Sequence, residues 1–576
     1  MTHRTQLVLV LALARCATAA AAPTWEPDGV PVCTASSNQL SPAAVSDGAG
    51  GAIVAWYDYR NGNADIYAQR VLPSGATDPG WPAGGRALCL ASGGQSAPAI
   101  VSDGSGGAIV VWQDDRGSSS DIYAQRILAS GAVDPSWPPN GRALCSVSGD
   151  QIFPAVTSDG AGGAIATWRD DRGGPDTDIY VQRVLASGAL DPAWPASGRA
   201  LCTAAGNQSV PAIAPDGLGG ALVAWSDLRN AVDSDIYAQR VLASGAVDPA
   251  WPADGRALCL AAWNQSGPAL VADGAGGAIV TWYDYRSGVE ADIYAQRVLA
   301  TGAIDPTWPP VGRALCTAAG EQYSPVSVAD DAGGAVVAWY DYRGGEVADI
   351  YAQRMLATGA VDPLWPPDGR ALCAADAEQS VPRIVSDGAG GAVVAWMDFR
   401  DSVSTDIFAQ RVLASGALHA GWPADGIALC TAGGEQYSPS PAADGSGGVI
   451  VPWTDFRPGA YADIYAQRAD LRGAVAAVEA GPPGSRLAIT ITPNPASGPV
   501  SIGLFLRGSM RVTVDVLDPA GRRVRTLLAG SELPAGAHRL AWDGRDEAGN
   551  AARRGVYWVR VRAEGAAIER RLVRVR

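Results

Sequence analysis

The chain has 576 residues, of which 47% are hydrophobic and 18% are charged, so it has enough apolar material for more than one core. Its formal net charge is −15, yet residues 486–576 contain 16 arginines and only 8 acidic residues. The remainder is therefore strongly acidic and would repel phosphate, which excludes nucleic acid as its partner. The 70 glycines and 40 prolines recur at fixed offsets, which is typical of an all-β protein with many turns.

The first residues have the pattern of a secretory signal peptide. Arg4 supplies the positive charge, residues 7–14 form an apolar run, and small residues at 17–22 offer cleavage sites. Cys16 follows a bulky arginine, whereas a lipoprotein signal needs a small residue there, so we do not expect a lipid anchor. No later stretch approaches the roughly 20 apolar residues of a membrane-spanning helix. We therefore predict a signal peptide at residues 1–22, no transmembrane segment, and a secreted or outer cell-surface protein.

Internal repetition dominates the rest of the sequence. A segment close to Asp-Ile-Tyr-Ala-Gln-Arg occurs at a spacing of 56 residues once and 57 thereafter, and begins at Asp65, Asp121, Asp178, Asp235, Asp292, Asp349, Asp406 and Asp463. A Gly-Gly-Ala-x-Val-x-Trp-like segment precedes each copy, and Trp-Pro-x-x-Gly-Arg-Ala-Leu-Cys lies between successive copies. A fixed period of this length means that one supersecondary unit is repeated along the chain.

Each unit contains four predicted strands. In the second unit they span residues 98–102, 107–113, 121–128 and 142–145, and glycine, aspartate and proline turns separate them. These runs are too short for helices. The second strand is apolar on both faces, so both faces of its sheet must be covered. A four-stranded sheet that lies between copies of itself is typical of a β-propeller blade.

The two ends of the repeat region complement each other. The last unit ends after Arg468 without a fourth strand of its own, whereas residues 30–33 form an isolated copy of a fourth strand. We therefore predict an all-β protein in which residues 23–473 form an eight-bladed β-propeller, closed by an N-terminal strand. The alternative is a longer array that does not close, although such an array would need polar end caps.

The repeat resembles a family of bacterial exported β-propeller repeat proteins. Its blocks have the form Gly-Gly-Ala-(Ile/Val)-Val-x-Trp-x-Asp-x-Arg followed by Asp-Ile-Tyr-Ala-Gln-Arg-Val, and the resemblance covers roughly residues 25–468. It implies a propeller fold and an exported location, but no activity.

The C-terminal part has a different pattern. Residues 474–486 are rich in glycine, proline and alanine, which is typical of a linker, and residues 487–576 contain about seven short strands, as in an Ig-like β-sandwich. This part resembles the Ig-like domain of flagellar hook-capping proteins and the C-terminal sorting domains of type IX secretion cargo; the matching segments are Pro493-Asn494-Pro495, Val516-Leu517-Asp518-x-x-Gly521-Arg522 and Gly555-Val556-Tyr557. The resemblance implies a sorting or attachment module that contacts the export machinery. An Ig-like spacer without a sorting role is the alternative.

Histidine-based chemistry is nearly excluded. His3 leaves with the signal peptide, so only His419 and His538 remain for a catalytic triad or a metal site. His419 replaces an aspartate of the repeat in a loop, and no phosphate-binding loop is present. We predict no catalytic residue, no metal site and no cofactor.

Carboxylates are the remaining candidates for catalysis. Asp58 with Asp65, and Asp284 with Asp292, form pairs of the kind that hydrolyse glycosides, and the Asp-x-Gly turns are similar to those of sialidase-type propellers; these turns lie at Asp47, Asp103 and Asp387. However, the same aspartate recurs in nearly every unit, with an arginine two residues later, as at Arg60, Arg116 and Arg286. An active site needs asymmetry, so the repeated pair predicts a structural clamp on a loop.

Tyrosines beside these aspartates suggest binding. The candidate ligand-binding residues are Tyr57, Tyr59, Tyr283, Tyr285, Tyr340 and Tyr342, which could stack on sugar rings and bind with avidity. Other units have Gln113, Ser226 or Met397 at the corresponding position. We hypothesise a monomeric, non-catalytic propeller that binds an extracellular glycan or protein. The alternative is a sialidase-like carbohydrate-active hydrolase, which needs a unit with several unique polar residues at the centre of the ring, and the sequence indicates none.

Eight cysteines follow the signal peptide, one in each fourth strand. Equivalent positions in neighbouring blades should be farther apart than the roughly 7 Å that a disulfide spans. We therefore predict free, buried thiols.

Overall fold

The computed structural model describes residues 25–457, 459, 461–470, 487–492, 500–506, 509–519, 521–533, 536–563 and 566–574. The predicted signal peptide, the linker at 474–486 and the segment Pro493-Asn494-Pro495 lie outside the described residues. All regular structure in the described residues is β-strand. None of these residues belongs to a helix that is long and apolar enough to cross a membrane.

Sheets of four antiparallel strands follow one another from residue 39 to residue 430, and in each sheet the strands pair in chain order. They consist of β2 (Gln39–Ser46), β3 (Ala52–Asp58), β4 (Asp65–Val71) and β5 (Arg86–Cys89); β6 (Gln95–Ser102), β7 (Ala108–Asp114), β8 (Asp121–Ile127) and β9 (Arg142–Cys145); β10 (Gln151–Ser158), β11 (Ala164–Asp170), β12 (Asp178–Val184) and β13 (Arg199–Cys202); β14 (Gln208–Pro215), β15 (Ala221–Asp227), β16 (Asp235–Val241) and β17 (Arg256–Cys259); β18 (Gln265–Ala272), β19 (Ala278–Asp284), β20 (Asp292–Val298) and β21 (Arg313–Cys316); β22 (Gln322–Ala329), β23 (Ala335–Asp341), β24 (Asp349–Met355) and β25 (Arg370–Cys373); β26 (Gln379–Ser386), β27 (Ala392–Asp398), β28 (Asp406–Val412) and β29 (Ile427–Cys430).

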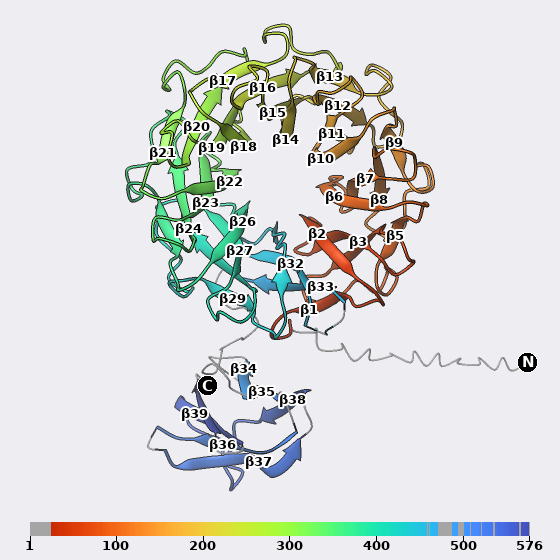
Figure 1. Cartoon of the computed structure of the whole chain (residues 1–576). Helices are drawn as coiled ribbons and strands as arrows, with labels where there is room; N and C mark the ends of the chain where they lie inside the picture. Colours follow the sequence, from red (N-terminus) through yellow and green to blue (C-terminus); the bar gives the residue numbers. More distant parts are fainter. Residues whose placement is uncertain are drawn as a thin grey trace, which may run out of the picture.

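The last sheet of this region combines strands from both ends of the repeats. It contains β30 (Gln436–Tyr437), β31 (Ala442–Ala443), β32 (Val449–Asp455), β33 (Asp463–Ala469) and, next to β33, the N-terminal strand β1 (Val30–Cys33). Val30 lies opposite Ala466 and Cys33 opposite Ile464. The segment at residues 30–33 therefore supplies the outer strand that the last unit lacks. Figure 1 shows the sheets arranged in a ring, with β1 beside β33.

The segment before β1 adds polar contacts to this closure. The Arg457 guanidinium donates to the Asp28 carbonyl at 2.6 Å, and the Gln467 amide donates to the Glu26 carbonyl at 2.8 Å. The Asp28 carboxylate accepts a hydrogen bond from the Thr431 backbone N–H at 2.8 Å. Residues 26–33 are thus bound to the last two sheets by both backbone and side-chain hydrogen bonds.

The innermost strands are longer than the sequence pattern predicts. In the second unit β6 begins at Gln95 rather than at residue 98, because the pairing with β7 shifts between Ser96 and Ala99. This bulge places Ala97 at a φ of 49°, and the following Pro98 has no N–H for the ladder. The corresponding residue has a positive φ in every innermost strand: Ser41, Phe153, Val210, Gly267, Ser324, Val381 and Ser438.

The cores of the ring lie between neighbouring sheets. One cluster joins Ile109 and Leu144 of one sheet to Trp168 of the next, together with Trp137 from the connection between β8 and β9. Such clusters recur around the ring, and the second-strand tryptophans are fully buried in all of them. Because each second strand is covered on both sides, its residues read as a continuous apolar run in the sequence.

The C-terminal region forms two sheets around a core of its own. One contains β34 (Leu487–Thr492), β35 (Val500–Leu506) and β38 (Gly536–Trp542), and the other β37 (Arg523–Leu533), β36 (Met510–Leu517), β39 (Gly555–Ala563) and β40 (Ala566–Arg574). Ile502 and Leu504 of the first sheet pack with Val512 and Val559 of the second. This arrangement is a β-sandwich.

Candidate functional site

The aspartate at the end of each second strand is enclosed in a polar clamp. Asp58 is fully buried, and its carboxylate accepts hydrogen bonds from the Trp56 indole at 2.9 Å and from the Arg60 backbone N–H at 2.9 Å. The Arg60 guanidinium pairs with this carboxylate and also donates to the Cys33 thiol at 3.0 Å. It lies 4.0 Å from the centre of the Tyr67 ring. Every lone-pair direction of the carboxylate therefore faces a donor.

The clamp recurs in each sheet of the ring. The Asp–Arg pairs are Asp58–Arg60, Asp114–Arg116, Asp170–Arg172, Asp227–Arg229, Asp284–Arg286, Asp341–Arg343, Asp398–Arg400 and Asp455–Arg457. Each arginine stacks on the tyrosine or phenylalanine of the third strand, with 3.7 to 4.0 Å between the guanidinium carbon and the ring centre. A buried ion pair with this many partners holds the end of a hairpin in one geometry.

The second carboxyl of each predicted catalytic pair lies directly across the hairpin from the first. Asp65 is opposite Asp58, and Asp292 is opposite Asp284. Burial and the neighbouring Asp284 raise the pKa of Asp292 to about 6. Because Asp65 and Asp292 are 1% and 8% exposed, a substrate has no direct access to either pair. The geometry therefore favours the structural interpretation of these carboxylates.

The Asp-x-Gly turns are also occupied by internal contacts. The Asp103 carboxylate accepts hydrogen bonds from the backbone N–H groups of Ser105 and Gly107 at 2.8 and 2.9 Å. Its other oxygen pairs with Arg126 of the third strand at 2.8 Å. Asp47 and Asp387 have equivalent ion pairs with the corresponding arginines. These aspartates join the turn between the first two strands to the third strand.

The cysteines belong to the same clamps. Each thiol described is free and buried, and each accepts a hydrogen bond from the clamp arginine of the neighbouring sheet, as Cys89 does from Arg116 at 3.2 Å. Burial raises the pKa of the Cys33 thiol to about 11 and that of Cys89 to about 12. These thiols are therefore protonated and poor nucleophiles at neutral pH.

The structure brings four of the predicted tyrosines together around a fifth that sequence analysis missed. Tyr323, the second residue of β22, lies between the pair Tyr283 and Tyr285 of one sheet and the pair Tyr340 and Tyr342 of its own sheet. The ring centres are 5.4 to 6.4 Å from that of Tyr323. We call these five residues the tyrosine cluster. All of them are half-buried, so part of each ring faces solvent.

Carboxylates border the tyrosine cluster. The Tyr323 hydroxyl hydrogen-bonds to that of Tyr285, and the Tyr342 hydroxyl donates to Glu378 at 3.4 Å. Burial, together with Glu321 and the Tyr285 hydroxyl, raises the pKa of Tyr323 well above its usual range. The cluster therefore presents aromatic faces next to hydroxyl and carboxylate groups.

Tyr57 and Tyr59 lie apart from this cluster. Their ring centres are 6.0 Å from each other, and Tyr59 is 38% exposed. The residue of the next sheet that corresponds to Tyr323 is Ser96, so no third ring among the described residues joins this pair. The sequence could have revealed this difference, because only Tyr323 and Tyr437 are aromatic at that register position.

Arg383 is a second departure from the repeat that sequence analysis missed. It lies opposite Ala395 on the innermost strand β26, where five other sheets have alanine, at Ala43, Ala99, Ala155, Ala212 and Ala269. Its side chain is solvent-exposed, yet the surrounding protein lowers the pKa of its guanidinium by desolvation. Its one described hydrogen bond goes to the adjacent Pro382 carbonyl at 3.1 Å. Within the part of the ring that the structure describes, no acidic side chain pairs with Arg383.

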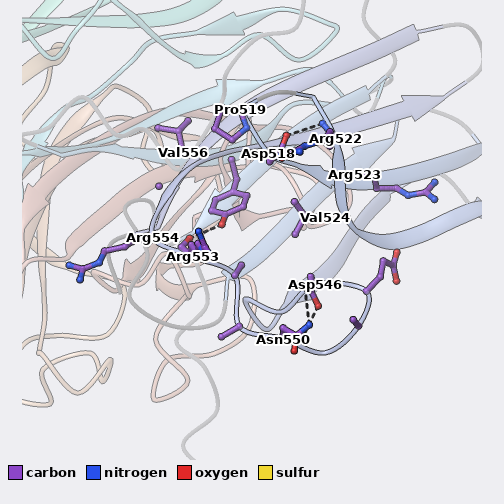
Figure 2. A pocket seen from close by; sticks show the side chains of 16 residues that line it. Asp518, Pro519, Arg522, Arg523, Val524, Asp546, Asn550, Arg553, Arg554 and Val556 are labelled. Atoms are coloured by element: carbon purple, nitrogen blue, oxygen red, sulfur yellow. Dashed lines mark hydrogen bonds and ion pairs between the residues drawn. The ribbon is translucent and has the colours of Figure 1, made fainter.

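The Ig-like region contains a groove of about 910 Å³. Residues of two segments that suggested the sorting-domain resemblance line it: Asp518, Pro519 and Arg522 of the first, and Gly555, Val556 and Tyr557 of the second. Figure 2 shows Arg523 and Arg554 at opposite ends of the groove, with Val524 between them. The Tyr557 hydroxyl donates to the Arg553 carbonyl at 2.6 Å, which fixes the turn that carries Arg553 and Arg554.

Comparison with known protein families finds a match in the C-terminal region of the chain. The FlgD Ig-like domain family matches residues 491–567. The expected Ig-like domain is therefore confirmed, whereas a sorting role for it stays a prediction. No curated protein matches the chain.

Solved structures similar to the chain include a protein of unknown function and two enzymes that act on polysaccharides. A protein of unknown function from Dyadobacter fermentans is 11% identical, with 77% of this chain and 97% of that chain covered and a TM-score of 0.36. An ulvan lyase of polysaccharide lyase family 25 is 10% identical, with 76% of this chain and 94% of that chain covered and a TM-score of 0.39. An α-L-arabinanase from Penicillium chrysogenum is 13% identical, with 56% of this chain and 94% of that chain covered and a TM-score of 0.33. At these scores the likeness carries no argument about fold or activity.

Proposed function

We propose that the chain is a secreted or cell-surface protein whose ring is an eight-bladed β-propeller that binds an extracellular glycan without cleaving it. In this proposal residues 1–22 are a signal peptide, 23–473 the propeller, 474–486 a linker, and 487–576 an Ig-like domain for export or attachment. The repeated four-stranded sheets and the pairing of β1 with β33 support the closed propeller. Without the pairing of β1 with β33, the outer edge of β33 would be exposed, and exposed sheet edges promote aggregation.

The tyrosine cluster carries the proposal of glycan binding. Tyrosine rings contact the apolar faces of sugars, and hydroxyl and carboxylate groups bind sugar hydroxyls. The five tyrosines occur together in two adjacent sheets, whereas the clamps occur in every sheet. A feature that the repeat does not need for folding, and that remains partly exposed, is best explained by a ligand.

Binding is tested with the full secreted chain on an array of polysaccharides and oligosaccharides, followed by calorimetry with the strongest ligand. Replacing both Tyr285 and Tyr342 by alanine should weaken its affinity by about tenfold or more, as for aromatic residues at the centre of an interface. Tyr59→Ala is the matched control, because Tyr59 is also exposed and next to a clamp but lies outside the cluster.

Three results would contradict the proposal. They are the absence of binding to any glycan, an equal loss of affinity in the Tyr59→Ala control, and release of new reducing ends from the bound glycan. The last result would make the protein a glycan-cleaving enzyme, and the role of the carboxylates would then have to be reconsidered.

A further inference from the structure

In the groove of the Ig-like region, the acidic side chains have hydrogen-bond or ion-pair partners, whereas three of the arginine side chains do not have described ones. Its acidic side chains are engaged by their own neighbours: Asp518 pairs with Arg522 at 2.8 Å, and Asp546 accepts from the Asn550 backbone N–H at 2.8 Å. Glu547 likewise accepts from the Thr526 backbone N–H at 2.8 Å. Each acidic side chain of the lining thus has a hydrogen-bond or ion-pair partner within the Ig-like region.

The arginines of the groove are different. Arg523, Arg553 and Arg554 are exposed, and their guanidinium groups have no hydrogen bond or ion pair to any residue that the structure describes. Arg523 and Arg554 lie at opposite ends of the groove (Figure 2). An exposed guanidinium that is free of internal partners is available for a carboxylate, to which it can donate two parallel hydrogen bonds.

Apolar side chains also line the groove, and Val524 lies between these arginines (Figure 2). Pro519, Val524, Ala552 and Val556 contribute to the lining, whereas the Tyr557 ring is 7% exposed. A sugar would need an exposed aromatic face in this position, and the buried tyrosine does not provide one. An extended polypeptide with acidic side chains on either side of an apolar one matches both the charged ends and the apolar lining.

We propose that this groove is a docking site for an acidic, partly apolar polypeptide segment of a partner protein. This inference specifies the attachment role proposed above for the Ig-like domain. It rests on that role only where it names the partner as a protein to which the domain attaches. Charge complementarity with the free arginines selects acidic chains, and the apolar lining selects chains that also carry aliphatic side chains.

The test uses the full secreted chain and a fluorescein-labelled peptide in which glutamates alternate with leucines. We expect saturable binding that weakens as salt is added, because exposed charges are screened within about 10 Å at 0.1 M ionic strength. The double variant Arg523→Gln and Arg554→Gln should lower the affinity about tenfold or more. Arg511→Gln removes an exposed arginine of β36 outside the groove and should leave the affinity unchanged.

Two control ligands separate the alternatives. A peptide with glutamine in place of glutamate, and a sulfated oligosaccharide of similar charge, should both bind at least about tenfold more weakly than the acidic peptide. Equal binding of the sulfated oligosaccharide, or an equal effect of Arg511→Gln, would overturn the proposal in favour of a non-specific basic surface. None of these results depends on glycan binding by the ring, so the two proposals fail or succeed separately.

Discussion

The clamps and the tyrosine cluster lie at the same ends of the same strands, but they differ in how often they occur. The clamp of Trp282, Asp284 and Arg286 has a counterpart in every sheet of the ring and is buried. The tyrosine cluster spans two sheets and is half exposed. In a ring of near-identical units, a repeated buried group serves the fold, whereas an exposed departure from the repeat is free to serve a ligand.

The strongest test of this comparison is to remove a segment that completes two clamps. Deleting residues 25–33 removes Cys33, which accepts from Arg60, and the Asp28 carbonyl, which accepts from Arg457. It also exposes the edge of β33. We expect the free energy of unfolding to fall by more than about 3 kcal/mol and solubility to drop. Denaturant unfolding and light scattering measure both effects.

A chain that ends at residue 474 is the control for this deletion, since the Ig-like region has a core of its own. The ring of that shorter chain should unfold as in the full chain. If the chain without residues 25–33 also unfolded like the full chain, β1 would not be part of the closure.

A single clamp should matter less, but more than one ordinary hydrogen bond. Asp284→Ala leaves the Trp282 indole and the Arg286 guanidinium without their carboxylate. We expect a loss of about 2 to 3 kcal/mol in the free energy of unfolding and unchanged glycan affinity. Glu346→Ala, in the exposed loop after β23, should change neither. Loss of binding or of hydrolysis at an unchanged melting temperature would instead assign the carboxylate a functional role.

The last test concerns a buried carboxyl group whose contribution to stability depends on pH. Burial, together with Asp401 and Asp398, raises the pKa of Asp406 to about 8, far above the roughly 3.9 expected in the unfolded chain. The folded state therefore favours the protonated form. Its contribution to stability is complete below about pH 4 and is lost as the pH rises through about 8.

Asp406→Asn remains neutral throughout this range. The variant should match the parent in melting temperature near pH 4 and exceed it near pH 8. Asp463→Asn is the matched comparison and should gain less, because burial and Asp455 raise the pKa of Asp463 only to about 6. A lower melting temperature of Asp406→Asn near pH 8 would mean that Asp406 is ionised and paired in the folded protein.

Much of the fold could be predicted from the sequence because the same local pattern occurs in every unit. The strand bounds of the second unit differ by a few residues at most, and the N-terminal strand pairs where the missing fourth strand predicted it. The bulge in each first strand was not predicted. The bulge is a shift in the pairing register between the first and second strands next to Pro98 and its counterparts, and the composition of the strand does not reveal such a shift.

The candidate site was only partly predictable. Tyr283, Tyr285, Tyr340 and Tyr342 were recognised from their place beside the clamp aspartates, but Tyr57 and Tyr59 have the same local sequence and lie outside the cluster. Tyr323 decides the difference, and it comes from the first strand of the next unit. Its contact with the other four rings follows from the way neighbouring sheets pack.

The sequence by itself determined the repeated unit, the strand content, the Asp–Arg pairs of the clamps and the complementary ends of the ring, because these depend on local residue patterns and their spacing. Only the tertiary structure decided which tyrosines meet, which arginines lack a partner, and which carboxyls are buried with raised pKa values. These properties depend on distances between residues of different sheets and turns. Such distances are fixed by the packing of whole sheets rather than by the sequence around any one residue.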